Sequence, residues 1–496
     1  MFRPYGPGPS LWESLLPPEA LVMAPELARV DVLLDDPVFF DPFRPFFSPL
    51  FGRPSTPIET FLRLMYLKYR YRLGFESLCR EVTDSVSWSR FCRIPLGGSV
   101  PDHSTLQKLA KRCGPTAIDG LNQALLTKAA AAKVLRTDTL RADTTVVPAD
   151  VRYPTDSGLL ARGVIRLVGL VAALHTLGLA VRTSMRDRRR SVRRRAHDMG
   201  VWLRRRSDQA KTETAAINAQ MVAIAEASLA EAKQVAGNAR RTIRRAGGQV
   251  SGKAVAKLVE LEITIARLER VVAQTRSRLA GDIPDAATRL VSLHDPDARP
   301  IKKGRIAKPV EFGYLGQVLD NVDGVIVDHS VEVGNPSDGP LLAPAVARVK
   351  TLAGRAPNKV TADRGYGAAD VDTQLTNMGV GTVAIIRKGR QSAARQGEER
   401  RPRFRKLIKW RTGSEARIST LKRQYGWGRT LMDGVAGTRT WCGYGVFAHN
   451  SNKISGLLTA NNGVAAHPTP TAVPDRSPRR RPPPRPKPPP PLPLSA

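Results

Sequence analysis

Three acidic residues fall where a sheet-based catalytic site would place them. Asp143 lies inside LRADTTVV, a Thr- and Val-rich segment in which a charged side chain is costly to bury without a partner. Asp363 follows KVTA and precedes a Gly-rich turn, at a strand end of the kind where α/β sheets form their sites. Glu415 follows on a predicted helix. Carboxylates from two strands and one helix would suit two Mg²⁺ or Mn²⁺ ions, which can activate an attacking water.

Basic residues accompany two of these acids. We predict one helix over RTGSEARISTLK, residues 411–422, on which Arg411, Glu415 and Lys422 lie near 0°, 40° and 20° at about 100° per residue. Such bases would offset the repulsion between an acidic site and a phosphate-bearing substrate. Arg364 and Tyr366, just after Asp363, are predicted to do the same. Taken alone, Arg411 and Glu415 also fit a simple ion pair four residues apart.

Other polar residues near these segments have alternative explanations. Asp138 is the main rival to Asp143, although its position predicts the start of the strand. Asp150 and Asp156 follow Pro148, which favours loop or capping roles. His329 in IVDHSVEVG either faces the site from a neighbouring strand or is a buried sheet histidine.

The overall charge favours a polyanionic partner. Lys and Arg number 78 against 44 Asp and Glu, a net charge of +34. Such surfaces attract phosphate backbones, so nucleic acid is expected, with an anionic membrane surface as the rival. The four cysteines form no CxxC pair and the seven histidines do not cluster beside them, which argues against zinc and favours reduced thiols in a cytosol.

The elements around the acids predict an α/β fold. Residues 1–136 are predicted to be mainly helical, with helix starts at Thr56-Pro57 and at Asp102 or Ser104. Strands are predicted at 137–149, 311–321, 324–335, 358–366 and 381–389, and a helix at 339–354. We therefore expect an N-terminal helical domain over 1–136 and a sheet flanked by helices over 137–182 and 304–460. The helical domain either contacts DNA or is a scaffold bundle without a partner.

Residues 183–303 interrupt this pattern. Eleven arginines fall between Arg182 and Arg206. A heptad seam then runs at alternating steps of three and four: Leu258, Leu261, Ile265, Leu268, Val272, Thr275 and Leu279. With a turn at 246–253, this predicts an inserted antiparallel helical hairpin. Residues 164–181 approach the length of a membrane span, but Arg166 and His175 interrupt them, so we expect a buried helix. Residues 461–496, rich in Pro and Arg, are predicted to be a disordered tail.

The three acidic blocks together resemble those of bacterial DDE-type insertion-sequence transposases, most closely the insertion-sequence four and five groups. RADTTVVPADVRYPTDSGLL resembles the region of the first Asp, TADRGYG that of the second, and RTGSEARISTLK that of the Glu. Arg411, Glu415 and Lys422 match the spacing of the family signature, whereas its Tyr position is occupied by Ile408. The resemblance covers residues 40–460, including the N-terminal helical domain.

This resemblance implies an RNase H-like core in which Asp143, Asp363 and Glu415 are the catalytic metal ligands. It implies an enzyme that binds the terminal inverted repeats of its element, cuts DNA with Mg²⁺ or Mn²⁺, and joins the 3′ ends to target DNA by transesterification. Such enzymes act on double-stranded DNA as homodimers or higher multimers, in the bacterial cytoplasm at the nucleoid and without a membrane. The alternatives are a related nuclease that cuts without joining and a DNA-binding protein without activity.

Overall fold

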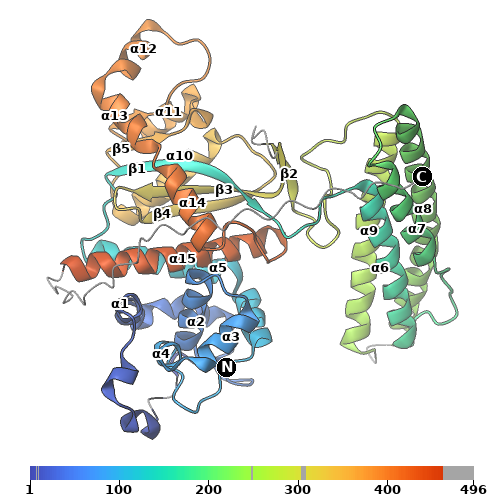
Figure 1. The fold of residues 1–496 in the computed structure, drawn as a ribbon, viewed down its shortest axis with the longest axis horizontal. Coiled ribbons are helices and arrows are strands. Elements are labelled where there is room, and N and C mark those ends of the chain that lie inside the picture. The colour runs from blue at the N-terminus through green and yellow to red at the C-terminus, as the bar shows by residue number, and fades with distance from the viewer. Residues whose placement is uncertain (7, 9, 247–249, 303–308, 462–496) are drawn as a thin grey trace, which may run out of the picture.

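The molecule has two lobes joined by extended segments (Figure 1). The structure, a computed structural model, describes residues 1–6, 8, 10–246, 250–302 and 309–461. The larger lobe contains a sheet with helices on both faces and the N-terminal helices beneath it, and the smaller lobe is a helical bundle. The predicted tail beyond Asn461 and part of the predicted 246–253 turn lie outside the described residues.

The N-terminal region is helical, as predicted. Short 3₁₀ helices η1 (Leu11–Leu15), η2 (Pro18–Leu21), η3 (Pro37–Phe39) and η4 (Asp41–Phe46) accompany α1 (Pro25–Leu34), α2 (Ile58–Arg70), α3 (Phe75–Asp84), α4 (Val86–Phe91) and α5 (His103–Ala131). Helix α2 begins directly after Pro57. The side chain of Asp102, rather than that of Ser104, caps α5 by accepting a hydrogen bond from the Ser104 N–H at 2.8 Å.

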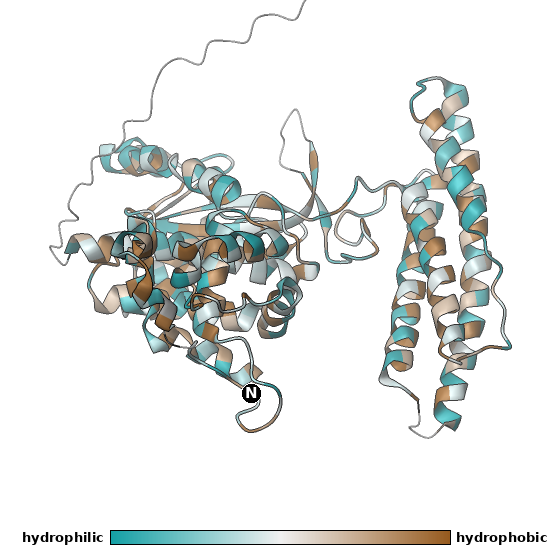
Figure 2. Ribbon diagram, turned by 60° about the horizontal axis from the view of Figure 1, so that its bottom comes forward, coloured by the Kyte–Doolittle hydropathy of each residue, from teal (hydrophilic) through white to brown (hydrophobic). Residues whose placement is uncertain are grey.

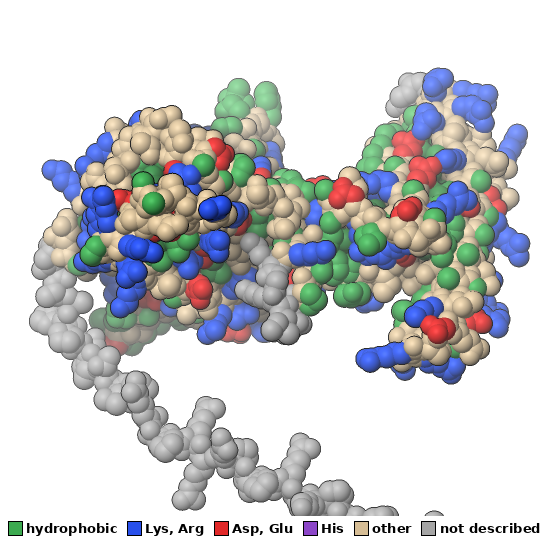
Figure 3. All heavy atoms as spheres, turned by 90° about the horizontal axis from the view of Figure 1, so that it is seen from above, with side chains coloured by type: hydrophobic (Ala, Val, Ile, Leu, Met, Phe, Trp, Pro, Cys, Tyr) green, Lys and Arg blue, Asp and Glu red, His purple; other side chains and the backbone are tan. Residues whose placement is uncertain are grey.

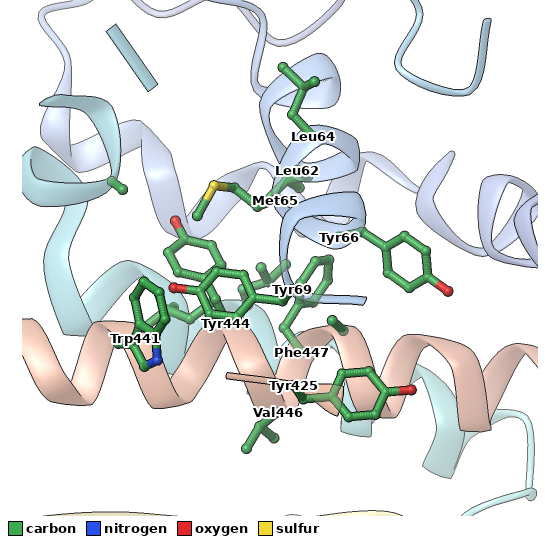
Figure 4. Packing of buried hydrophobic residues seen from close by; sticks show 14 of the residues in the cluster. Leu62, Leu64, Met65, Tyr66, Tyr69, Tyr425, Trp441, Tyr444, Val446 and Phe447 are labelled. Atoms are coloured by element: carbon green, nitrogen blue, oxygen red, sulfur yellow. The ribbon is translucent and has the colours of Figure 1, made fainter. Parts of the chain in front are cut away.

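The last helix, α15 (Gly434–Asn461), packs between the N-terminal helices and the sheet. It contacts α5, α2 and α1 on one side and strand β4 (Ile326–Val333) on the other. In Figure 4, aromatic side chains from α2 and α15 meet, and the Tyr69 ring lies 5.0 Å from the Trp441 ring and stacks on Tyr444. A helix predicted to belong to the sheet domain is therefore shared by both parts of the large lobe.

All four cysteines are free thiols: Cys79, Cys92, Cys113 and Cys442. Burial raises the pKa of both the Cys92 and the Cys442 thiol well above its usual range. These thiols are therefore protonated at neutral pH and serve as small apolar groups in the core, in line with the predicted absence of a disulfide framework.

The sheet is mixed, and its order brings distant segments together. The strands are β1 (Thr139–Pro148), β2 (Arg299–Lys302), β3 (Val310–Asn321), β4, β5 (Lys359–Ala362) and β6 (Thr382–Ala384). The order is β2-β3-β1-β5-β6, and β4 also pairs with β3. β3 is antiparallel to β1, β2 and β4, whereas β1, β5 and β6 are parallel. Strands lie in all five predicted segments, but β5 and β6 end well before the predicted residues 366 and 389, and β2 was not predicted.

Helices cover both faces of this sheet, which confirms the predicted α/β class at that level. Helix α10 (Gly339–Ala353), predicted at 339–354, and α11 (Ala369–Asn377) bury apolar residues of β1 and β5 on one face. On the other face lie α13 (Pro402–Arg411), α14 (Ser414–Gln424) and α15, after the short α12 (Ala393–Arg400). The side chains of β1 alternate between the two faces, so neighbouring residues serve different environments.

The small lobe is a four-helix bundle rather than a hairpin. It contains α6 (Asp156–Thr176), α7 (Arg189–Trp202), α8 (Asp208–Arg245) and α9 (Gly252–Leu279). Helix α6, predicted to lie in the sheet domain of 137–182, instead packs against α8 and α9. The reason is that the long α8–α9 hairpin carries more apolar surface than its own contact buries, and α6 covers the remainder.

The predicted heptad seam closes within one chain. Its residues from Leu258 to Thr275 are buried in the bundle, and Leu279 is 39% exposed at the helix end. Helix α6 is long and apolar enough to cross a membrane by length and composition, and 61% of its most apolar window is buried in the bundle. Figure 2 shows hydrophilic residues over much of the outer side of this lobe. The predicted buried helix over 164–181 therefore corresponds to α6, which is buried in the bundle and not against the sheet.

Candidate active site

Asp143 and Asp363 are neighbours on the central strands of the sheet. In the parallel pair of β1 and β5, Ala142 lies opposite Ala362, so the next positions are Asp143 and Asp363. Adjacent strands are about 4.8 Å apart, and residues in register project from the same face. Two carboxylates 220 positions apart in the sequence therefore stand side by side where β5 ends.

Helix α14 meets this pair at Asp143. Ser414 Oγ donates a hydrogen bond to Asp143 Oδ2 at 2.7 Å, and the Thr144 N–H donates to Oδ1 at 2.8 Å. Burial is the largest cause that raises the pKa of the Asp143 carboxyl above its usual range; the charge of Asp363 adds to it. The hydrogen bonds from Ser414 and Thr144 and the positive charge of Arg411 oppose this shift. Asp143 is thus a half-buried acid held beside a second one.

A further acid, Asp338, lies beside Asp363. Asp338 Oδ1 accepts a hydrogen bond from Thr144 Oγ1 at 2.9 Å instead of capping α10, which begins at the next residue. Asp363 Oδ1 accepts a hydrogen bond from the Gly365 N–H at 2.7 Å. A Cβ on Gly365 would lie within 3 Å of both Asp338 Oδ2 and Asp363 Oδ1, so these oxygens are less than about 6 Å apart. In the sequence SDGPLL, Asp338 resembles an ordinary helix start, and no local pattern indicates its partner.

The predicted single helix over 411–422 is wrong. Helix α13 ends at Arg411 and α14 begins at Ser414, so Arg411 and Glu415 lie on different helices. At the break, bonds of the 3₁₀ type connect Gly413 to Trp410 and Glu415 to Thr412. The carbonyl of Trp410 accepts a hydrogen bond from Arg141 Nη1 at 3.0 Å, and the Arg141 guanidinium leaves no room for a Cβ at Gly413.

Three charged side chains hold this break against the sheet. Arg141 on β1 donates two hydrogen bonds of 2.8 Å to the carboxylate of Asp320 on β3. Arg417 on α14 donates to the same carboxylate at 3.1 Å, and Arg141 lies 4.7 Å from the centre of the Trp410 ring. The Asp320 side chain is 2% exposed, so this cluster is a buried, hydrogen-bonded ion network. It fixes the start of α14 next to Asp143.

Glu415 occupies the first turn of α14, one residue after Ser414. Its side chain is exposed, and among the described residues it forms neither a hydrogen bond nor an ion pair. The ion pair with Arg411 that the sequence left open is therefore not present. A carboxylate in the first turn of a helix is favoured by the helix dipole, and here that end of the helix points to Asp143.

The predicted basic residues surround the acids at different depths. Arg411, at the end of α13, is close enough to Asp143 to lower its pKa, and Arg364 is exposed beside Asp363. Lys422, in the last turn of α14, lines a cleft of about 370 Å³ whose other basic residues are Lys68, Arg72 and Arg429. This cleft joins α14 to the N-terminal helices.

Tyr366 and Ile408 do not lie at the surface of this site. Tyr366 is fully buried on the α10 side of the sheet, and its hydroxyl accepts a hydrogen bond from Gln317 Nε2 at 3.0 Å. A direct contact from Tyr366 to a substrate is therefore not available, and its position supports the loop after Asp363. Ile408 lies on α13, before the break, so the position of the family's Tyr is on a different helix from Glu415.

The rival acids serve local structure. Asp138 forms an ion pair with Arg355 at 2.9 Å at the start of β1, away from the β5 end where Asp363 lies. Asp150 pairs with Arg429 and Asp156 with Arg278. These contacts agree with the loop and capping roles predicted for them.

His329 is a half-buried histidine of the sheet. Its partner in register is Val318, which separates it from Asp143 by one strand, and its ring lies 6.3 Å from that of Trp427. Burial lowers the pKa of His329 to about 4, so the ring is neutral at pH 7. Of the two roles predicted for His329, a residue that faces the site or a histidine of the sheet, the structure shows the second.

The donor set suits a hard cation in part. Asp143 and Asp363 offer carboxylate oxygens side by side, and a cation between them would relieve the repulsion that raises the Asp143 pKa. Within the described residues, however, no three His, Cys, Asp or Glu side chains are close enough together to hold an ion. The exposed Glu415 carboxylate therefore stands apart from the pair.

Gly365 offers a direct test of this acidic arrangement. In Gly365→Ala, the new Cβ would overlap the carboxylate oxygens of Asp338 and Asp363, and both would have to move. For the strand cutting that the resemblance of the acidic blocks implies, we expect a fall of about 10- to 100-fold, because displacements near 1 Å can cost that much. The assay is strand cutting with labelled duplex. Gly397→Ala on α12, where a Cβ meets nothing within 4 Å, should cut like the wild type. Equal rates in both variants would contradict the role given to this loop.

Comparisons with known proteins support an insertion-sequence transposase family. Residues 12–112 match the family model described as Transposase domain (DUF772). A protein of Rhizobium meliloti, described as uncharacterized protein ORF8 in the nfe locus, is 30% identical over 162 residues. That match covers 30% of this chain and 78% of the relative. No solved structure matches the chain.

Proposed function

The chain belongs to an insertion-sequence transposase family, and from this premise we propose that it cuts and joins DNA by DDE chemistry at Asp143, Asp363 and Glu415. The observation that carries the proposal is the juxtaposition of Asp143 and Asp363, in register at the end of β5, with the start of α14 fastened beside them by Ser414. The acids follow the order expected for that family: the first Asp lies on the first strand of the sheet, the second at a later strand, and the Glu on a helix. This order supports an RNase H-like core.

We assign the binding of Mg²⁺ or Mn²⁺, two ions when DNA is present, to these three carboxylates. Bound there, the metal would polarise the phosphodiester and lower the pKa of an attacking water or 3′-hydroxyl. Asp143 and Asp363 are already neighbours, and Ser414 holds Asp143 in orientation. Glu415 has no competing partner among the described residues, so its flexible side chain is free to turn toward the pair.

The proposed reaction has two phosphoryl transfers. In the first, the oxygen of water bonds to phosphorus and the bond from phosphorus to the 3′ oxygen breaks, which leaves a 3′-hydroxyl and a 5′-phosphate. In the second, that 3′ oxygen bonds to a phosphorus of target DNA and displaces the adjacent 3′ oxygen of the target strand. No bond between protein and DNA forms, so the side chains of this site bind, orient and stabilise charge.

The basic residues around the acids would hold the DNA backbone. Arg411 and Arg364 would neutralise phosphates next to the carboxylates, and Lys422 would contact the backbone from the neighbouring cleft, as the net charge of +34 also favours. Tyr366 would act from beneath, by holding the loop that carries Asp363. We propose that the N-terminal transposase domain contributes to recognition of the inverted repeats, and that two or more copies bring both ends together in the bacterial cytoplasm.

The test is a cutting and joining assay with full-length protein. Labelled duplexes carrying the ends of the chain's own element are incubated with Mg²⁺, or with a chelator, and with wild type, Asp363→Asn or Glu415→Gln. We expect Mg²⁺-dependent cutting and joining by the wild type, and variants that bind DNA but do neither. If the variants cut as well as the wild type, the acids are structural and the proposal fails. Cutting without joining would indicate a nuclease, and binding without cutting a non-catalytic DNA-binding protein.

A further inference from the structure

Helix α7 of the bundle carries a row of arginines on its outer face. At about 100° per residue, Arg193, Arg190 and Arg194 lie near −60°, 0° and 40° around the helix. The buried residues of α7, Val192 and Met199, lie near 200° and 180°, on the opposite side. All three arginines are exposed, so α7 is anchored by one face and presents guanidinium groups on the other.

Within the described residues these arginines form no ion pairs, unlike others in the same bundle. Arg166, Arg240 and Arg276 each form an ion pair with a glutamate on another helix: Glu260, Glu262 and Glu226, respectively. Arg190, Arg193 and Arg194 form no ion pair or side-chain hydrogen bond with any of the described residues. Arg193 does lie near enough to Asp187 for its charge to help lower the pKa of that carboxyl, although the hydrogen-bonded partner of Asp187 is Arg189. The arginines that hold the bundle together are thus a different set from those on its outer face.

The basic surface continues beyond α7. Arg204, Arg205 and Arg206 follow directly and are exposed, and Arg205 lies 4.6 Å from the centre of the Trp202 ring. Figure 3 shows Lys and Arg side chains along the outer side of the bundle lobe, which stands apart from the large lobe. A polyanion bound here would therefore lie away from Asp143 and Asp363.

We propose that the outer face of α7, defined by Arg190, Arg193 and Arg194, binds the phosphate backbone of duplex DNA away from the cutting site. This inference rests on the proposed function, because DNA is then the polyanion that the chain must hold. Guanidinium groups are suited to phosphate, and backbone contacts do not depend on sequence. A membrane surface is less favoured, since the apolar faces of the four helices are used inside the bundle.

The test compares two variants that lose the same charge. One carries Arg190→Gln, Arg193→Gln and Arg194→Gln, and the control carries Arg166→Gln, Arg240→Gln and Arg276→Gln at the paired positions. Full-length proteins are titrated with a labelled random-sequence duplex of 30 base pairs at several salt concentrations, with a chelator to prevent cutting. Three lost phosphate contacts at about 0.9 each should lower the slope of log affinity against log salt by about 2.7, and the control should change it by less than 1. Circular dichroism checks that both variants are folded.

The outcomes separate this inference from the proposed function. Equal slopes for the two variants would overturn the α7 surface. The surface would also be overturned if the α7 variant lost its binding to phosphatidylserine vesicles but kept its DNA binding. In either case, metal-dependent cutting by the same α7 variant would leave the proposed function intact. If the wild type binds DNA with the expected slope but never cuts, the proposed function fails while the surface stands.

Discussion

Replacing Asp143 by Asn should lower the rate of strand cutting by about 10³-fold or more while DNA binding stays close to that of the wild type. The carboxylate is proposed to hold a metal ion, and a lost metal contribution of several kcal/mol corresponds to that factor. Asn keeps the shape of the side chain and can still accept a hydrogen bond from Ser414. Binding is retained because Arg364, Arg411 and Lys422 are untouched. The assay is single-turnover cutting of end-labelled duplex at saturating protein.

The same variant should be at least as stable as the wild type when no divalent ion is present. The pKa of Asp143 is raised in the folded state, chiefly by burial and then by Asp363, so its charged form opposes folding. Below the unfolded pKa near 3.8, the carboxyl is protonated in both states and does not oppose folding. As the pH rises from that value through the raised folded pKa, the folded state loses stability, because the buried carboxyl must ionise. The stability advantage of Asn should therefore be largest near neutral pH and shrink as pH falls through the raised pKa, which thermal unfolding at several pH values can follow.

Asp138→Asn is the matched control for this prediction. Asp138 precedes the same strand but pairs with Arg355, and both side chains are exposed. It should cut at nearly the wild-type rate and show little change in stability. If Asp138→Asn abolished cutting and Asp143→Asn did not, the assignment of Asp143, instead of Asp138, as the first catalytic acid would be wrong.

Replacing Arg141 by Gln should destabilise the large lobe by about 3 kcal/mol and slow cutting by tenfold or more. Removal of one partner from a buried ion network leaves an incompletely compensated charge, which costs about 3–5 kcal/mol in comparable cases. Here Asp320 would keep only Arg417, and the Trp410 carbonyl would lose its side-chain donor at the break between α13 and α14 while it keeps the Gly413 N–H. Loosening this break frees Ser414 and Glu415 from their position beside Asp143. Urea unfolding and the cutting assay measure the two effects.

Arg136→Gln tests whether burial is the cause. Arg136 also donates two hydrogen bonds to an aspartate of the neighbouring β3–β4 connection, Asp323, but its side chain is 62% exposed. Exposed pairs contribute about 0–1 kcal/mol, so Arg136→Gln should unfold near the wild-type urea midpoint and cut normally. Similar losses in the two variants would show that Arg141 has no special part in placing α14.

The acids on strands could be predicted from sequence because their signals are local. A charged residue in a Thr/Val-rich run and an Asp between a strand and a Gly-rich turn describe β1 and the end of β5. The in-register contact of Asp143 and Asp363 depends on the pairing of β1 with β5, which no stretch of sequence contains. Asp338 was missed for the same reason: Thr144, its partner, is 194 residues away.

The errors arose where a distant residue decides a local structure. Periodicity continues through residues 411–422, and Thr412 and Gly413 keep helical torsion angles, yet Arg141, 269 residues from Trp410, interrupts the helix there. The assignment of α6 to the sheet domain failed in a similar way. Its apolar pattern indicates burial correctly, but only the contacts with α8 and α9 show which core buries it.

The ion pair between Asp156 at the start of α6 and Arg278 near the end of α9 bears on how the chain assembles during synthesis. β1 ends at Pro148, but its partner β3 begins at Val310, so β1 leaves the ribosome long before it can pair. The bundle's core, by contrast, lies almost wholly within residues 159–272 and can form first. Once folded, with Arg278 bound to Asp156, it brings the two ends of the insertion together. We therefore expect the folded bundle to hold the two ends of the insertion together, in place of the slow closure of a flexible loop of about 160 residues. This should shorten the time that β1 spends as an unpaired strand.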